Sequence, residues 1–387
     1  MLFMETDMLK FVQKNTFTIV FAVMVLVMFA GYLFNKGGEF SPAENRYLAE
    51  RPRITLSGIY DGSFMKNFEL YTKEQLPLRD ALIRLKAVSG EIMFKNENNG
   101  IARGAQGHLF EKLVSTSEQL SKNKAAICSF AERSGRDISV CIIPNSCEIL
   151  TQDVPAGFPN ISQKAEIDGF YGELSSFGNV NAVSVYETLK DNSDRYIYYR
   201  TDHHWTTLGA YYGYLRICEA MGLTPWKEAE DQKSDRLRTA DGFYGTYYSK
   251  YRGIMGGLAD TISYYDIPVD SYETGGIRYD NLYDLAKLDT YDKYAMFMYG
   301  NEGIGIVECK PSEAAGKRGE LIVFKDSYAN CLIPFLTYNY DRLIVIDLRY
   351  YPEPVSELLD AHKDADILLL YNFMHFNEDN HFYRLTS

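Results

Sequence analysis

Two histidines stand side by side in the stretch TDHHW, with an aspartate before them and a tryptophan after them. Asp202 and His204 are separated by one residue, so in an extended or turn conformation both side chains can point the same way. A carboxylate placed like this fixes the tautomer of an imidazole, which can then take a proton from a hydroxyl group. The stretch therefore predicts an acid–base pair, with His203 pointing elsewhere.

The same stretch permits two other interpretations. Thr201 or Asp202 could cap a helix predicted over residues 205–220, and the histidines would then be incidental. The histidines could also bind a metal ion, but no HExxH motif supplies further ligands, and adjacent histidines rarely coordinate one ion together. Both alternatives stay open, although the acid–base pair is favoured and no metal or cofactor is expected.

A candidate nucleophile stands much later in the chain, in the stretch LIVFKDSYANC. Asp326 and Ser327 follow an apolar run and precede a predicted helix. In open parallel sheets, sites form beyond the carboxyl ends of the strands, and a serine there exposes its hydroxyl near the positive end of a helix. With His204 beside it, Ser327 could attack an acyl carbonyl. The alternative is that Asp326 and Ser327 only cap the helix.

The elements that would position these residues alternate between strands and helices. Apolar runs rich in β-branched residues predict strands buried on both faces, and amphipathic runs predict the helices between them. Repeated units of this kind imply an α/β fold with a doubly wound parallel sheet and helices on both faces. Strands are predicted at 137–144, 179–186, 319–327, 341–349 and 365–372, and helices at 162–177, 205–220, 328–338 and 354–363.

A segment rich in glycine and tyrosine interrupts this alternation between about residues 226 and 319. Its poor periodicity predicts an insertion of loops and short strands. Within it, Tyr244, Tyr247, Tyr248 and Lys250 form a polar aromatic cluster that could line a glycan groove. Ordinary packing of a tyrosine-rich loop is the alternative.

The N-terminal part predicts a membrane anchor. Residues 17–34 are uncharged and long enough to cross the hydrocarbon core at about 1.5 Å per residue. No convincing cleavage site follows, so we expect an uncleaved single-pass anchor. Residues 1–16 would then be a short cytoplasmic segment, residues 35–60 a linker and residues 61–387 an extracytoplasmic domain. Two helices separated at Pro77 are predicted between residues 63 and 94.

Composition excludes some classes of function. The net charge of −12 argues against nucleic-acid binding, which needs a dense basic face. The six cysteines lack CxxC spacing, which favours buried free thiols, although a Cys128–Cys147 or Cys141–Cys147 bridge stays open. The 31 tyrosines suit a sugar-binding surface or reflect a general compositional habit.

The block TDHHWT, together with ENRYL near residue 45 and KDSY late in the chain, resembles the DHHW family of bacterial surface proteins. That family is related to the SGNH-hydrolase-like alginate O-acetyltransferases, and the helical stretch over residues 68–85 is also similar to a segment of that group. The resemblance implies an SGNH-hydrolase-like (flavodoxin-like) fold with a circularly permuted order of motifs. The Asp-x-His block would come first and the serine later.

The resemblance also implies roles for individual residues. Asp202 would orient the base, His204 would be the base and Ser327 the nucleophile. The serine block departs from the usual GDS because Lys325 stands in place of glycine, which leaves a close backbone turn unproven. Asn372, at the end of the last predicted strand, is a candidate oxyanion donor beside the Ser327 N–H, and a plain loop asparagine is the alternative.

Three tyrosines complete the predicted site. Tyr328, Tyr244 and Tyr248 are candidates for substrate binding. The function implied is that of a membrane-anchored, extracytoplasmic O-acetyltransferase that acts on a cell-surface polysaccharide through an acetyl-serine intermediate. A membrane-bound O-acyltransferase would be the partner that supplies acetyl groups. An acetyl-esterase with the same triad and a non-catalytic polysaccharide-binding or assembly protein of the envelope are the alternatives.

Overall fold

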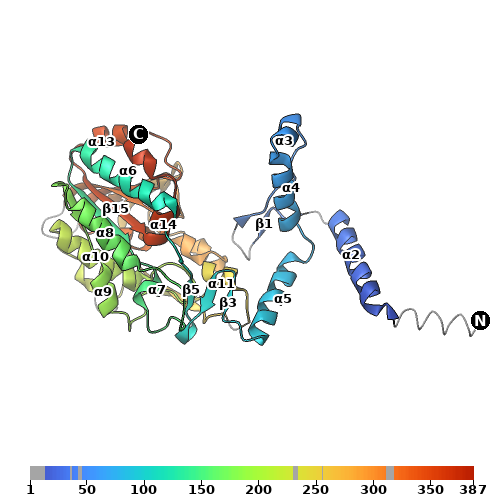
Figure 1. The fold of residues 1–387 in the computed structure, drawn as a ribbon. Coiled ribbons are helices and arrows are strands. Elements are labelled where there is room, and N and C mark those ends of the chain that lie inside the picture. The colour runs from blue at the N-terminus through green and yellow to red at the C-terminus, as the bar shows by residue number, and fades with distance from the viewer. Residues whose placement is uncertain (1–13, 35–36, 42–45, 230–233, 255, 311–317) are drawn as a thin grey trace, which may run out of the picture. The chain divides into compact units, whose positions relative to one another are not determined.

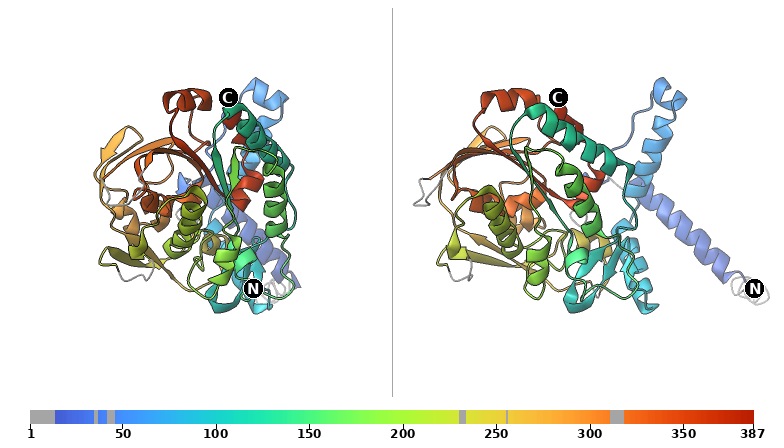
Figure 2. Two further views of the ribbon diagram at one scale, coloured as in Figure 1. Left: turned by 90° about the vertical axis from the view of Figure 1, so that its left-hand side faces the viewer. Right: turned by 60° about the vertical axis from the view of Figure 1, so that its left-hand side comes forward.

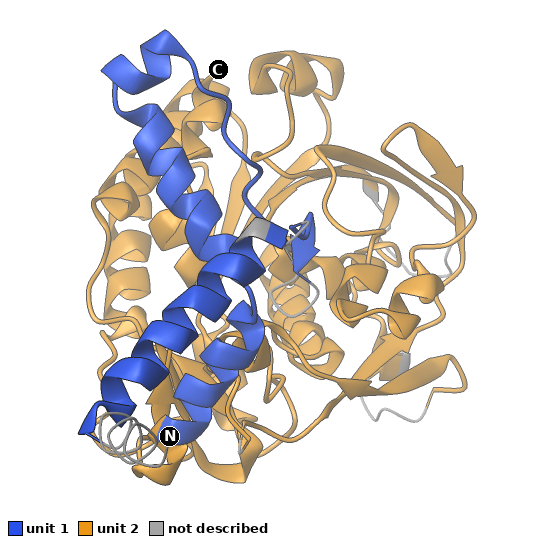
Figure 3. Cartoon of the chain, turned by 90° about the vertical axis from the view of Figure 1, so that its right-hand side faces the viewer, with its two compact units in different colours: residues 1–89 blue, residues 90–387 orange. Residues whose placement is uncertain are grey.

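The structure is a computed structural model that describes residues 14–34, 37–41, 46–229, 234–254, 256–310 and 318–387. The chain forms two compact units, residues 1–89 and residues 90–387 (Figure 3). Most of the predicted cytoplasmic segment, residues 1–16, lies outside the described residues. The division between the units falls further along the chain than the boundary expected after residue 60.

The first unit is mainly helical. Helix α2 covers the whole apolar run, residues 17–34, in which the anchor was predicted. Within the described residues, however, no helix has both the length and the apolar character that a membrane span requires, so the predicted anchor over residues 17–34 is not supported. The expected linker contains a short hairpin and α3. The elements of this region are α2 (Thr16–Phe34), β1 (Phe40–Ser41), β2 (Arg46–Tyr47), α3 (Leu56–Tyr60), α4 (Ser63–Glu74) and α5 (Arg79–Ile92).

The break between α4 and α5 confirms the two helices predicted around Pro77. Proline lacks a backbone donor and disfavours helical conformation in the residue before it. Leu78 then adopts a positive φ of 58°. The chain therefore turns at this point and starts a new helix at Arg79.

An eight-stranded sheet forms the centre of the second unit (Figure 1). Its strand order is β11-β10-β12-β14-β13-β15-β6-β7. The strands β14, β13, β15, β6 and β7 pair in parallel, whereas β12, β10 and β11 are antiparallel to their neighbours. The sheet strands are β6 (Ile138–Ile143), β7 (Val180–Ala182), β10 (Val269–Thr274), β11 (Ile277–Tyr279), β12 (Ile304–Cys309), β13 (Arg318–Lys325), β14 (Tyr340–Ile346) and β15 (Asp366–Asn372).

The α/β class and the five predicted strands are confirmed, but the prediction of a wholly parallel sheet is wrong. The segment expected as an insertion supplies three antiparallel strands to the same sheet. Its strand β12 alternates between buried and more exposed residues. That is the pattern of a strand covered on one face, and it lacks the continuous apolar run that identifies a central parallel strand.

Helices cover both faces of the sheet (Figures 1 and 2). Successive residues of a strand enter opposite cores, as the two-residue period of a strand requires. In β6, for example, Val140 belongs to the core under α6, α8, α13 and α14, while Cys141 belongs to the core under α10 and α12. The helices are α6 (Glu118–Ser134), α7 (Ser146–Ile149), α8 (Gln163–Leu174), α9 (Tyr186–Asp191), α10 (Thr207–Met221), α11 (Thr246–Tyr251), α12 (Ile333–Leu336), α13 (Val355–Ala361) and α14 (Phe373–Glu378).

Smaller elements connect these layers. The predicted helix over residues 328–338 is divided into a 3-10 turn and α12, and the C-terminus ends in another 3-10 turn. The remaining elements are β3 (Glu97–Asn98), β4 (Ile101–Arg103), β5 (Leu109–Glu111), β8 (Leu237–Phe243), β9 (Asp260–Tyr265), η1 (Ala105–Gly107), η2 (Lys227–Ala229), η3 (Leu285–Asp289), η4 (Lys293–Met296), η5 (Ser327–Cys331) and η6 (Phe382–Thr386).

Many tyrosines and most cysteines are buried in the hydrophobic core. Tyrosines such as Tyr198, Tyr211 and Tyr340 are among the largest fully buried side chains. All six cysteines are free, and five of them are buried, which confirms the predicted free thiols. Much of the tyrosine surplus is therefore used for packing and does not mark a sugar-binding surface.

Candidate active site

A continuous chain of hydrogen bonds joins Asp202, His204 and Ser327. The Asp202 carboxylate lies 2.5 Å from His204 Nδ1, and His204 Nε2 lies 2.8 Å from the Ser327 hydroxyl. Asp202 and His204 are buried, while Ser327 is partly exposed. The structure thus brings together residues that are more than a hundred positions apart in the sequence.

The turn that contains Asp202 and His204 is stabilised by its own backbone. The His204 N–H donates to Asp202 Oδ1 at 3.0 Å, so the same oxygen holds both the backbone and the ring of His204. Thr206, not Thr201 or Asp202, caps helix α10, through a hydrogen bond from the Gly209 N–H. The capping alternative for Thr201 and Asp202 is therefore wrong.

Ser327 lies where β13 ends and η5 begins. Asp326 caps this turn by accepting a hydrogen bond from the Tyr328 N–H at 2.9 Å. The other oxygen of Asp326 accepts from the Asn372 N–H at 2.8 Å, which ties the turn to the end of β15. Because Asp326 does the capping, the Ser327 hydroxyl is left to contact His204.

Trp205 connects the two turns. Its indole Nε1–H donates to the Tyr328 carbonyl at 2.8 Å, and the ring is fully buried. This contact links the residue after His204 to the residue after Ser327. The tryptophan of the TDHHW block therefore positions the imidazole against the hydroxyl.

Helix α11 supports the Asp202 carboxylate from behind. Asp202 Oδ2 accepts hydrogen bonds from Thr246 N at 2.8 Å and Thr246 Oγ1 at 3.2 Å. A Cβ at Gly245 would lie 2.2 Å from the Asp202 side chain, so only glycine allows this close approach. Burial would raise the pKa of Asp202, but His203, His204 and these hydrogen bonds hold that pKa well below its ordinary value. Asp202 therefore stays ionised beside the imidazole.

Tyr294, in the segment expected as an insertion, packs against the imidazole. Its ring stacks on the His204 ring with centroids 3.7 Å apart and planes 11° apart. The Tyr294 hydroxyl donates to the Ser327 carbonyl at 3.0 Å. Sequence reasoning missed Tyr294, Thr246 and Gly245. The glycine–tyrosine bias of their segment was the one available signal, and it does not single out any of the three.

His203 also faces the site, so the prediction that it points elsewhere is wrong. Its Nδ1 lies 2.7 Å from Thr246 Oγ1, and its ring is 3.8 Å from the ring of His204. The chain turns at this point instead of running extended, which places neighbouring side chains together. Desolvation of the ring and the nearby His204 lower the pKa of His203 to about 4.

The chain is similar in sequence to one protein family. The family model described as DHHW protein matches residues 111–346, well over half of the chain. The chain belongs to the DHHW protein family. The match includes Asp202, His204 and Ser327. No curated protein matches the sequence significantly.

Two solved structures, those of a DHHW family protein and of PatB1, show the same fold. A DHHW family protein from Eubacterium siraeum has a TM-score of 0.60 at 23% identity, covering 75% of this chain and 96% of that one. Bacillus cereus PatB1, in a structure with a sulfonyl adduct, has a TM-score of 0.55 at 17% identity, covering 74% and 97%. The O-acetyltransferase domain of Pseudomonas putida AlgJ has a TM-score of 0.41 at 13% identity, covering 73% and 93%.

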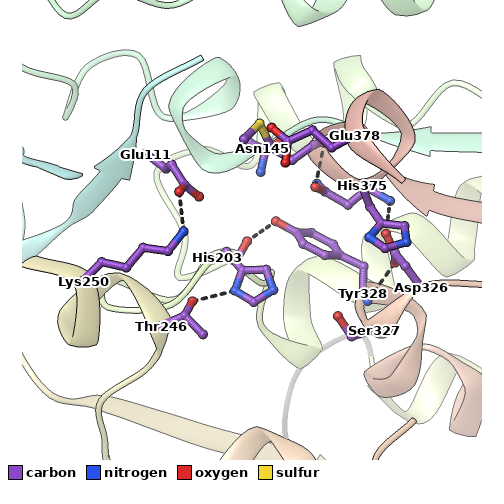
Figure 4. Close-up of a pocket in the computed structure, with 12 residues that line it drawn as sticks. Glu111, Asn145, His203, Thr246, Lys250, Asp326, Ser327, Tyr328, His375 and Glu378 are labelled. Carbon is purple, nitrogen blue, oxygen red and sulfur yellow. Dashed lines mark hydrogen bonds and ion pairs between the residues drawn. The ribbon is translucent and has the colours of Figure 1, made fainter. Parts of the chain in front are cut away.

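In this DHHW protein, Ser327 opens into a cavity of about 300 Å³. Tyr328 and Asn372 line the cavity, and their roles in substrate binding stay predictions. Tyr244 and Tyr248 do not line it; their rings pack against each other with centroids 4.5 Å apart. Figure 4 shows the lining side chains, which are Glu111, Asn145, His203, Thr246, Lys250, Asp326, Ser327, Tyr328, Asn372, Met374, His375 and Glu378.

Two asparagines differ in how far their side chains are already hydrogen-bonded. Asn372 Oδ1 accepts from the Met374 N–H at 3.0 Å, and Asn372 Nδ2 donates to the Ile143 carbonyl at 3.1 Å. Asn372 therefore caps α14, and its role as an oxyanion donor stays a prediction. Asn145 Oδ1 is buried and has no hydrogen-bond partner among the described residues.

Lys325 occupies the position that is glycine in the usual GDS block. Its backbone does not adopt the left-handed conformation that favours glycine. The buried ammonium group donates to Asn301 Oδ1 and Asn330 Oδ1, both at 2.8 Å, and lies 3.8 Å from Asp347. Burial lowers the pKa of Lys325 to about 8. The lysine therefore connects the turn that contains Ser327 and Asn330 to Asn301 and Asp347.

A second histidine–carboxylate cluster lies on the wall of the cavity. Asp379 Oδ2 lies 2.8 Å from His375 Nε2, and Asp379 Oδ1 lies 2.5 Å from His381 Nδ1. Burial would raise the pKa of Asp379, but His375 and His381 lower it to about 2. Only His375 of these three residues lines the cavity.

The metal alternative can be compared with this geometry. Asp202, His203 and His204 offer ligand atoms within 4.8 Å of one another. However, His204 Nδ1 faces the Asp202 carboxylate and His204 Nε2 faces the Ser327 hydroxyl. An ion bound by all three residues would have to displace these hydrogen bonds, so the geometry suits proton transfer better than metal coordination.

Proposed function

We propose that this protein is an O-acetyltransferase that modifies a cell-surface polysaccharide outside the cytoplasm. The observation that carries the proposal is the hydrogen-bonded chain from Asp202 through His204 to Ser327, with distances of 2.5 and 2.8 Å. An imidazole held between a carboxylate and a serine hydroxyl is the arrangement that activates serine for acyl transfer. The DHHW family resemblance and the fold agree with this assignment.

The first half of the reaction would acetylate Ser327. The Ser327 oxygen attacks the acetyl carbonyl of the donor while its proton passes to His204 Nε2. The tetrahedral intermediate then collapses, and His204 returns the proton to the leaving group of the donor. Asp202 holds the Nδ1–H of His204 and stabilises the imidazolium that forms.

The second half would transfer the acetyl group to the glycan. A sugar hydroxyl gives its proton to His204 and attacks the acetyl-Ser327 carbonyl. Collapse of the second intermediate breaks the bond to Ser327, which regains its proton from His204. Donor and acceptor thus use the same base in turn.

Both intermediates need donors for the oxyanion. The Ser327 N–H, at the start of η5, has no acceptor among the described residues and is the first proposed donor. Asn372 is the second, although its amide already contacts Ile143. Asn145 lines the same cavity, and its Nδ2–H group is a third candidate donor.

The acetyl donor is proposed to be a membrane-bound O-acyltransferase. A partner of this kind would carry acetyl groups across the membrane and present them to Ser327. The proposal comes from the family resemblance. The partly exposed hydroxyl of Ser327 in an open cavity is compatible with it.

The direct test is to incubate the protein with p-nitrophenyl acetate and measure the intact mass. We expect one acetyl group on Ser327 of the wild type and none on Ser327→Ala. Ser356→Ala, an exposed serine on α13, is the matched control and should behave as the wild type. A sulfonyl fluoride should label the same proteins as the ester.

The fate of the acetyl group separates the alternatives. Transfer to an added oligosaccharide supports the transferase, whereas release of acetate at the same rate with and without a glycan supports an esterase. If the wild type and Ser327→Ala acquire no adduct from either reagent, the protein is better described as a non-catalytic binding or assembly protein.

A further inference from the structure

The mouth of the cavity carries more negative than positive charge. Three carboxylates line it, those of Glu111, Asp326 and Glu378. Lys250 is the one lysine or arginine among the described lining residues, and it forms an ion pair with Glu111 (Figure 4). No lysine or arginine of the lining is therefore left to pair with a negative group on a ligand.

The two histidines of the lining do not change this balance. The pKa of about 4 keeps His203 neutral near pH 7. His375 Nε2 lies 2.8 Å from Asp379, so a positive charge on His375 is matched by a carboxylate directly behind it. Each group in the lining that could be cationic is thus neutral or already paired.

Glu378 supplies the unmatched charge. It is exposed at the end of α14, so a ligand entering the cavity can reach it. Desolvation and the nearby carboxylate of Glu111 raise the pKa of Glu378, and this outweighs the opposing effect of Lys250 and His375. None of these groups forms an ion pair with Glu378 among the described residues. Glu378 lines the same cavity as the Glu111–Lys250 ion pair, and its own charge is the one that would repel a negative group entering the cavity.

We propose that Glu378, Glu111 and His375 form the acceptor subsite, and that this subsite selects a glycan without negative charges. The inference rests on the proposed function, because it names the acceptor of that reaction. Carboxylate oxygens accept hydrogen bonds from sugar hydroxyls and from the ammonium group of an amino sugar. A uronic acid polymer would bring a carboxylate on every sugar into a mouth that offers it no free cation.

The experiment compares three oligosaccharides of equal length: N-acetylglucosamine (neutral), glucosamine (cationic) and galacturonate (anionic). Each is supplied as the acceptor to acetyl-Ser327 protein, and kcat/KM of transfer is measured at low salt. We expect the neutral and cationic oligomers to exceed the anionic one by roughly tenfold or more, from one unpaired charge a few ångströms away. The difference should shrink as salt is added.

Charge reversal tests the subsite itself. Glu378→Lys should reduce the preference for glucosamine over galacturonate by about tenfold or more. Glu357→Lys changes the net charge by the same amount on the exposed face of α13 and should leave the preference unchanged. If galacturonate is the best acceptor of the wild type, or if both variants shift the preference equally, the inference is overturned.

Binding without turnover distinguishes this inference from the proposed function. The affinities of the three oligomers for Ser327→Ala are measured by titration calorimetry. The same order of affinities supports the subsite even if acetyl transfer fails. An acetylated Ser327 combined with tightest binding of galacturonate would retain the function and reject the subsite.

Discussion

The chain contains the same Asp-x-His turn twice. In both, the backbone N–H of the histidine donates to the aspartate Oδ1 at 3.0 Å, and the ring Nδ1 lies 2.5 Å from the same oxygen. One turn is formed by Asp202 and His204, and the other by Asp379 and His381. Local sequence thus produces one geometry in two places.

The two turns differ in what lies around them. His204 Nε2 meets the Ser327 hydroxyl at 2.8 Å, and its side chain is 6% exposed. The side chain of His381 is 33% exposed, and no described residue forms a hydrogen bond with its Nε2. The Asp-x-His turn by itself therefore only orients an imidazole. A distant segment has to supply the hydroxyl that makes it chemically useful.

Asp202→Asn should have the largest effect, because only the Asp202–His204 turn faces a serine hydroxyl. An amide cannot hold the correct tautomer of His204 as a carboxylate does, so we expect acetylation of Ser327 to slow by between about 10² and 10⁴-fold. The rate is measured with p-nitrophenyl acetate, with circular dichroism to verify folding. His381→Asn, in the other turn, should change the rate less than about twofold. Equal rates for both variants would mean that the two turns are equivalent.

Gly245→Ala should have the next largest effect. The added Cβ would lie 2.2 Å from the Asp202 side chain and would push the carboxylate away from His204. Because small displacements of a reacting group are costly, we expect a loss of roughly 10- to 100-fold in the acetylation rate. Gly172→Ala is the control, since a Cβ there meets nothing within 4 Å. If Gly245→Ala acetylates Ser327 at the wild-type rate, displacement of the Asp202 carboxylate does not impair the reaction.

Asp379→Asn should change the free energy of unfolding. The pKa of Asp379 falls from 3.8 to about 2 on folding, so its ionised form stabilises the folded state by roughly 2 kcal/mol. This stabilisation is fully present above about pH 3.8 and is lost as the pH falls through about 2. Urea unfolding at pH 6 should therefore show Asp379→Asn less stable by roughly that amount, and the gap should close near pH 2.

Asp364→Asn provides the control for that measurement. Asp364 is exposed beside the last strand, and its substitution should leave the unfolding free energy within a few tenths of a kcal/mol. A gap between the wild type and Asp379→Asn that persists at pH 2 would show that the carboxylate stabilises the fold by something other than its charge.

The central part of the site could be predicted from the sequence. The apolar run before Lys325 is long enough to identify a buried strand, and its end is where Ser327 lies. The spacing of Asp202 and His204 suggested that both side chains face one way. These signals are local, because each depends on a few neighbouring residues.

The supporting residues could not be predicted in this way. Thr246 and Tyr294 lie in a segment without periodicity, and they reach His204 or Asp202 only through the tertiary fold. The antiparallel strands were missed for a related reason. Burial alternates along β12, but its residue types (IGIVEC) do not alternate between apolar and polar, so the sequence gives no two-residue period. His203 was misplaced because the chain turns where an extended conformation was one of the options.

The lysine beneath the serine turn has a consequence for the whole molecule. The pKa of Lys325 falls from 10.5 to about 8 on folding. Between those values the unfolded chain binds the extra proton, so stability rises with pH across that window, and at neutral pH the buried ammonium works against folding. The buried Lys325 ammonium thus makes the folded state less stable beside Ser327, the proposed nucleophile. Three side-chain oxygens, those of Asn301, Asn330 and Asp347, surround this buried ammonium group and hold the turn in one conformation.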